Sequence, residues 1–340
     1  MPSRNIDPPQ ANLWLNRRML LEGVALGVSY GLLLRLVVLN IPARSWLSKA
    51  GIPQASGVMT VAFLVLGPLV MGLLTIRRAD AHGPSRVWQW IFVPWVSVVL
   101  MMVVTALLNI EGAICIAMAL PIALICATIG GVIGGIIGRY RKLPRTATLS
   151  IAILPFVLGP AEARLTAPDQ TRTVSSEIRI HASPSVVWHN IQRVPSIDPS
   201  ELQTTWAQRI GFPRPVEATL SYEGIGGVRH ASFERGLLFL ETVTAWEPEH
   251  RLAFSIKADS AHIPPTTLDE HVTIGGRYFD VLDGEYQIEP LPNGDVLLHL
   301  TSHQRLSTNF NGYAGIWSDA VMQSLQTSIL QVIQHRCEKA

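Results

Sequence analysis

The sequence predicts two parts: an α-helical membrane domain, then an α+β domain of antiparallel strands that ends in a long helix. Composition and periodicity indicate this division. The 340 residues are 48% hydrophobic and only 15% charged, whereas about a quarter of the residues of an average soluble domain are charged. The apolar excess lies before residue 160, and from about Thr173 the chain adopts the apolar–polar alternation typical of strands.

Charge and cysteine content exclude several classes of function. The net charge of +2 and the lack of a Lys/Arg run argue against a nucleic-acid partner. Cys115 and Cys126 would lie roughly 16 Å apart on one helix, too far for a disulfide, and Cys337 stands alone. No CxxC pattern or cofactor motif is present, so we expect neither a metal nor a cofactor.

Four stretches are long enough to cross a bilayer as helices, which takes about 20 apolar residues. They are Met19–Asn40, Ala55–Ile76, Val87–Leu108 and Ala113–Gly138. No cleavage site follows the first stretch, so we interpret it as a retained span. Lys and Arg gather before the first, between the second and third, and after the fourth, which predicts a cytoplasmic N-terminus in the cell (inner or plasma) membrane.

A fifth apolar segment, Ala147–Pro160, leaves two topologies open. As a helix it would cover about 21 Å, less than the ~30 Å hydrocarbon core, and it contains Pro155. A re-entrant segment would leave the following domain in the cytoplasm, whereas a short span would place it on the outer (periplasmic) side. We favour the span, because RYRKLPR before it is a strong inside anchor.

Polar and small residues within the spans suggest how these helices pack. Glu22 and Arg35 lie near span ends, which favours snorkelling to the interface over a polar pathway. Gly130, Gly134 and Gly138 fall on one helical stripe, a pattern that lets helices approach closely and indicates self-association through these glycines.

After the apolar half, the pattern predicts seven strands and two helices. The strands are Ser176–His181, Glu217–Tyr222, Gly227–Arg235, Leu237–Trp246, Leu252–Lys257, Gly284–Leu291 and Asp295–Gln304. The first helix begins with Ser183 as N-cap and Pro184 at its first position. The last covers Gly312–Arg336, with an apolar stripe from Ile316 through Leu325 and Ile329 to Ile333.

Three stretches carry a family resemblance: IRIHASPSVVWHNI, GIGGVRHASFERGLLFLETVTAWEP and GEYQIEPLPNGDVLLHLTS. Their order resembles the START-like or Bet v1-like superfamily (the polyketide cyclase/dehydrase and lipid-transport group), and in particular its membrane-anchored members. The resemblance implies a helix-grip fold, in which a curved sheet wraps the last helix and leaves an apolar cavity. We therefore expect a tail at 1–18, a helical membrane domain at 19–160, a linker at 161–173 and a cavity domain at 174–337.

The cavity candidates lie on two neighbouring strands and near the last helix. If the hairpin closes around Arg235 and Gly236, Arg229 and Glu241 lie opposite each other, as a structural ion pair or as an anchor for the polar end of a ligand. The candidate lining residues are Arg229, Ala231, Phe233, Phe239, Glu241, Val243, Tyr286 and Trp317. The loop Ala258–Asp280 is long enough to border the cavity mouth.

Other motifs have plainer interpretations. GIGGVR leads into a strand, so its glycines indicate a turn and not a nucleotide site. His299 and His303 would lie about 13 Å apart along one strand, too far to share a metal. No nucleophile-elbow motif is present.

Three functions remain open. We expect binding of a membrane lipid or another apolar small molecule at the membrane surface. A cyclase-like enzyme would use Glu241, His230 and Tyr286 as acid or base groups. A structural or regulatory membrane protein would instead fill the cavity with its own side chains.

Overall fold

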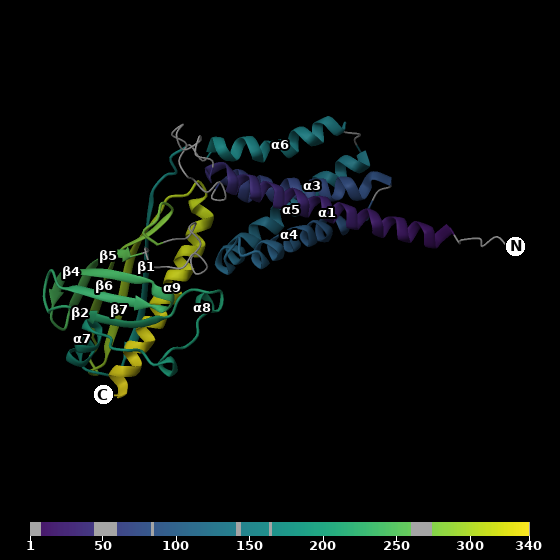
Figure 1. Ribbon diagram of the computed structural model, residues 1–340. Helices are drawn as coiled ribbons and strands as arrows, with labels where there is room; N and C mark the ends of the chain where they lie inside the picture. Colours follow the sequence, from purple (N-terminus) through teal and green to yellow (C-terminus); the bar gives the residue numbers. More distant parts are fainter. Residues whose placement is uncertain are drawn as a thin grey trace. The chain divides into compact units, whose positions relative to one another are not determined.

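The computed structural model describes residues 8–43, 60–82, 85–140, 144–162, 165–259 and 274–339. The chain forms two compact units (Figure 1). The first is helical and comprises Met1–Glu111 and Cys115–Thr166, and the second comprises Ala167–Ala340 together with Gly112–Ile114. Each unit is considered by itself below.

The helical unit contains helices long and apolar enough to cross a membrane. Its elements are α1 (Pro8–Ala43), η2 (Ala62–Leu66), α3 (Gly67–Ala79), η3 (Asp80–His82), α4 (Gln89–Leu107), α5 (Ala113–Tyr140) and α6 (Arg145–Glu162). Four stretches meet the criteria of length and composition: Arg17–Val37, Ala62–Ala79, Gln89–Leu107 and Ala113–Tyr140. The predicted second span began at Ala55, outside the described residues, and the apolar helix Thr146–Glu162 contains the predicted fifth segment.

Glycines bring α5 against α3 and α4 almost backbone to backbone. A Cβ atom added at Gly130 would lie 1.8 Å from the carbonyl oxygen of Leu69, and one added at Gly131 would lie 2.1 Å from that of Trp90. Gly134 faces Leu73 at 3.0 Å in the same way. This stripe is thus covered within one copy of the chain. Self-association through the same glycines stays a prediction, and it would require α3 to move aside.

The buried arginine of α1 is paired inside this unit. The Arg35 side chain is 2% exposed and bonds the Glu111 carboxylate, and its Nη2 donates to the carbonyl oxygen of Ile110. The snorkelling interpretation is therefore wrong for Arg35, because a partner 76 positions along the chain satisfies its charge within the protein. Glu22 remains partly exposed and pairs with Arg78 of α3.

The second unit is a seven-stranded antiparallel sheet that curls around a long helix (Figure 1). The strands are β1 (Gln170–Ile180), β2 (Pro215–Leu220), β3 (Val228–Phe233), β4 (Leu238–Glu247), β5 (Arg251–Asp259), β6 (Phe279–Pro290) and β7 (Val296–Leu306). Their order in the sheet is β1-β7-β6-β5-β4-β3-β2. The long helix is α9 (Asn311–Lys339), and this arrangement agrees with the predicted helix-grip fold.

The strand ends differ from the prediction where pairing is long-range. β1 begins at Gln170 and β6 at Phe279, because both pair with β7 as far as Leu306. The short helices η4 (Pro199–Glu201) and α8 (Trp206–Arg209) were not predicted. Most of the loop that we expected to border the cavity, 260–273, lies outside the described residues.

The core of this unit lies between the sheet, α7 (Pro184–Gln192) and α9. Val187 and Ile191 of α7 are fully buried. The predicted stripe of α9 is wrong at one end, because Ile316 is 66% exposed. Gln326 of the same helix, although polar, is buried. Its side-chain amide donates to Val174 O at 3.0 Å and to Ser302 Oγ at 3.1 Å, and these bonds offset the cost of burying it.

Candidate functional site

The β3–β4 hairpin sets the register of the site. The turn η5 (Glu234–Gly236) reverses the chain with positive φ angles at Arg235 (62°) and Gly236 (82°). As a result Arg229 lies directly opposite Glu241, as predicted. Because side chains alternate between the two faces of a strand, both residues point to the face that α9 covers.

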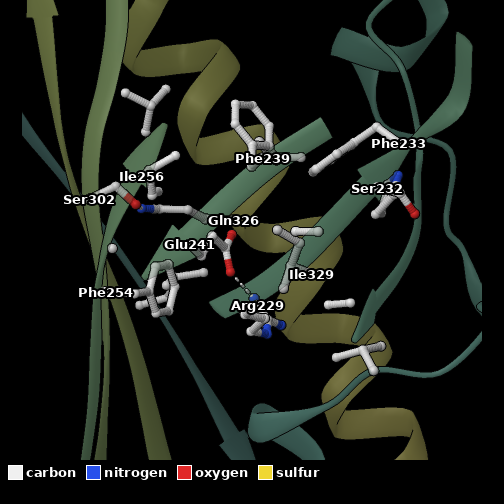
Figure 2. Close-up of a pocket in the computed structure, with 18 of the residues that line it drawn as sticks. Arg229, Ser232, Phe233, Phe239, Glu241, Phe254, Ile256, Ser302, Gln326 and Ile329 are labelled. Carbon is white, nitrogen blue, oxygen red and sulfur yellow. Dashed lines mark hydrogen bonds and ion pairs between the residues drawn. The ribbon is translucent and has the colours of Figure 1, made fainter. Parts of the chain in front are cut away.

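Arg229 and Glu241 form a buried ion pair in the concave face of the sheet (Figure 2). Arg229 Nη1 donates to Glu241 Oε2, and the two side chains are 5% and 8% exposed. The guanidinium lies 5.7 Å from the centroid of the Phe254 ring. Arg229 Nε is buried and has no hydrogen-bond partner among the described residues. The pair thus has one donor to spare.

Burial and mutual attraction shift the pKa values of three groups. Burial lowers the pKa of Arg229, but the charges and hydrogen bonds of Glu241 and Tyr286 together raise it more, so the guanidinium stays charged. Burial raises the pKa of Glu241, against the opposing effect of Arg229. Burial also raises the pKa of Tyr286 to about 12, although the charge of Arg229 lowers it. Tyr286 is therefore a protonated phenol at neutral pH.

The pair faces a pocket between the sheet and α9 (Figure 2). The cavity volume is about 80 Å³. Its apolar wall from the sheet includes Phe233, Phe239 and Phe254, and its wall from α9 includes Met322 and Ile329. The lining is mostly apolar, apart from the Arg229–Glu241 pair, Glu217 and a few uncharged polar side chains, and it suits a mostly apolar guest with one polar group.

The structure brings together six of the eight predicted lining residues. Those six are Arg229, Ala231, Phe233, Phe239, Glu241 and Tyr286. Val243 is not among the residues that line the pocket, and it is buried in the hydrophobic core of this unit. Trp317 is also misplaced by the prediction, since its ring lies against that of Trp206, with 6.3 Å between centroids.

Sequence reasoning missed a polar contribution from α9 and β7. Gln326 and Ser302 line the pocket and bond each other at 3.1 Å. Gln326 lies three residues before Ile329, on the side of α9 that faces the sheet. That spacing could have indicated that Gln326 faces the pocket. A polar residue within an apolar stripe cannot, however, be assigned to the interior without knowing its hydrogen-bond partners.

Histidines supply no metal site in the described part of the chain. No group of three or more His, Cys, Asp or Glu residues there is arranged to hold an ion. His299 lies between Glu177 at 3.3 Å and Glu289 at 3.2 Å, and His303 Nδ1 lies 2.6 Å from Asp283 Oδ1. All five side chains lie outside the pocket lining.

Comparison with known proteins gives likeness of fold only. No family model and no curated protein matches the sequence. A START superfamily protein from Mycobacterium smegmatis is 11% identical, with a TM-score of 0.33, over 49% of this chain and 97% of that one. A truncated norcoclaurine synthase from Thalictrum flavum is 12% identical, with a TM-score of 0.31, over 49% and 92%. At these values nothing about function follows for this chain.

Proposed function

We propose that the C-terminal unit binds an apolar small molecule in the pocket, and that the helical unit anchors it in the cell membrane. The observation that carries this proposal is the cavity of about 80 Å³, lined by aromatic and aliphatic side chains and by the buried Arg229–Glu241 pair, whose Arg229 Nε has no hydrogen-bond partner among the described residues. An unpaired buried donor is costly, and a ligand oxygen that accepts its hydrogen removes that cost.

Charge favours a neutral ligand over a carboxylate. Glu241 already compensates the charge of Arg229. A second carboxylate would leave two buried anions beside one guanidinium, and an uncompensated buried charge is strongly unfavourable. A hydroxyl, ketone or ether oxygen accepts the Nε–H bond without adding charge.

Volume limits the size of the guest in this conformation. One water needs roughly 10–15 Å³ of such volume, so the cavity accommodates about five to eight water-sized groups. This is the scale of a single ring or of the end of a longer chain. A complete lipid chain would require the walls to move apart.

The cyclase-like alternative loses support from the arrangement of its candidate groups. His230 is exposed on the other face of the sheet. Glu241 is engaged with Arg229, and Tyr286, with a pKa of about 12, gives up no proton near neutral pH. A general acid or base works best when its pKa lies near the operating pH.

The test is a substitution that enlarges a side chain inside the pocket, with a matched substitution outside the pocket as the control. Ala231 lines the pocket, whereas Thr219 on the neighbouring strand is exposed. The full chain is purified in lipid nanodiscs as wild type, Ala231→Trp and Thr219→Trp. We expect molecules that co-purify with the wild type, identified by mass spectrometry, to persist in Thr219→Trp and to be lost from Ala231→Trp.

Small-molecule probes distinguish a pocket that binds ligands from a core that is filled by the protein's own side chains. Ligand-observed NMR with p-cresol, toluene and p-toluate should show affinity in that order for the wild type, because only p-cresol has a neutral oxygen. A wild-type chain that carries no co-purifying molecule and binds none of the three would refute the binding function. A marked fall in melting temperature of Ala231→Trp without loss of ligand would indicate a packed core, since overpacking costs about 1–3 kcal/mol.

The proposed location requires five spans, with the N-terminus inside and residues 170–340 outside. The Lys/Arg distribution and the apolar helix Thr146–Glu162 support it. Reporters active only in the cytoplasm, fused at Gln170 and at the C-terminus, should both be silent. Activity at both positions would exclude the fifth span.

A further inference from the structure

An exposed aromatic patch lies at one end of the sheet domain, away from the pocket lining. It consists of Trp206 on α8 and of Ile316 and Trp317 on α9, and we call it the α8–α9 patch. Trp206 is 40% exposed and Ile316 66% exposed. Trp317 is partly buried, with its ring against that of Trp206. Single exposed apolar residues are normal on a protein surface, but a cluster of this kind is a candidate interaction site.

Local hydrogen bonds hold the patch in shape. A capping box in which Thr205 N donates to Gln208 Oε1 at 3.0 Å fixes the turn that presents Trp206. Gln208 Nε2 reaches Ser328 Oγ on α9 at 3.3 Å. The patch is therefore a preformed surface, not the chance exposure of a loose loop.

Positive charge borders the patch. Arg209 is exposed on α8 itself, and Arg235 of the β3–β4 turn donates to the carbonyl oxygen of Gly211 at 3.3 Å. Indole rings flanked by basic side chains are the composition found at the level of lipid head groups.

Chain connectivity limits how far this end of the domain can lie from α6. α6 ends at Glu162 and β1 begins at Gln170, so the intervening residues span at most about 29 Å. The start of α9 is tied to the same end, because Asn311 Nδ2 donates to the carbonyl oxygen of Pro168 at 2.8 Å. With α6 in the membrane, as proposed above, the covalent chain limits how far the α8–α9 patch can lie from the bilayer, on whichever side the domain is.

We propose that the α8–α9 patch rests on the lipid bilayer, with its indoles among the head groups and Arg209 and Arg235 beside phosphates. The proposal rests on the membrane anchoring proposed above. It gives the domain a defined orientation, with Ser221–Gly227, the β2–β3 turn at the other end of the strands, directed away from the lipid.

A matched pair of fluorescent labels tests the orientation in the full chain. Ile316→Cys places a label in the patch, and Ile225→Cys places one at the opposite end, at a residue of similar exposure (66% and 69%). Each chain is reconstituted into liposomes whose lipids carry a nitroxide quencher near the head group. The unaltered chain, with Cys115, Cys126 and Cys337, gives the labelling background.

We expect several-fold stronger quenching at position 316 than at position 225, and a further gain when anionic lipid is added. Equal quenching at both positions, in liposomes that float with the protein, would overturn the proposal. A patch that instead contacts a second copy would show weak quenching at 316 together with energy transfer between labelled chains, which also overturns it. Protein that fails to float would refute the anchoring itself, separately from any result of the ligand experiments.

Discussion

In the helical unit, α5 approaches α3 so closely that a Cβ atom at Gly130 would lie 1.8 Å from a backbone oxygen, whereas in the sheet domain α9 stands off β3 and β4 around a cavity of about 80 Å³. The residues at each contact explain the difference. Glycines let helix backbones touch, which brings more atoms of the two helices within the range of dispersion attraction. In the sheet domain, the bulky rings of Phe233, Phe239 and Phe254 line the space between the sheet and α9.

Each unit also contains a buried arginine–carboxylate ion pair in which one guanidinium nitrogen makes no hydrogen bond to the described residues. Arg35 Nη1 and Arg229 Nε are both buried without a hydrogen-bond partner among the described residues. The surroundings differ, because Arg229 lines the pocket and Arg35 does not. The spare donor of Arg229 thus belongs to a residue that borders the cavity, whereas that of Arg35 does not.

The largest expected effect comes from breaking the pair in the sheet domain. Glu241→Leu leaves the Arg229 charge uncompensated and should lower the free energy of unfolding by about 3–5 kcal/mol. The double variant Arg229→Met/Glu241→Leu should lose much less, because no charge remains buried. Denaturant unfolding of the three chains measures this. A double variant as unstable as Glu241→Leu would show that the pair contributes through shape and not charge.

An intermediate effect is expected from closing the space between two helices. Gly130→Ala places a methyl group against the Leu69 carbonyl and should lower the stability of the helical unit by about 1–3 kcal/mol. Gly159→Ala is the control, because its nearest neighbours would lie at 3.8 Å, an ordinary contact. Thermal inactivation in nanodiscs compares them. Equal loss in both variants would mean that the close approach of α5 and α3 is not what holds the unit together.

The smallest effect concerns acid stability of the sheet domain alone. Hydrogen bonds from Asn293 and Arg179, with a contribution from His181, lower the pKa of Asp295 from 3.8 to about 2. Because the folded value lies below the unfolded one, the carboxylate stabilises the fold above about pH 4, and this contribution is lost as the pH falls towards 2. Melting temperatures of the wild type and Asp295→Asn should therefore differ near pH 5 and converge near pH 2. A constant difference across that range would contradict the assignment.

Local patterns were sufficient for much of the sheet domain. The hairpin around Gly236 predicted that Arg229 and Glu241 lie opposite each other. The two residues are only twelve positions apart, and the single turn between them sets the register of the strands. Alternation likewise predicted that Ala231, Phe233 and Phe239 share the concave face. The apolar segments before residue 160 predicted four long apolar helices, since composition alone decides that property.

Only tertiary structure decided which side chains meet across long stretches of chain. Arg35 finds Glu111 at a separation of 76 residues, and Gln326 finds Val174 at 152, so no periodicity within one element predicts either partner. The prediction that Trp317 lines the pocket failed for the same reason. Its aromatic neighbour, Trp206, lies on α8, and the sequence pattern of α9 gives no information about that contact. The face of a helix or strand on which a side chain lies is set by local geometry. The residue that it contacts there depends on how distant elements pack.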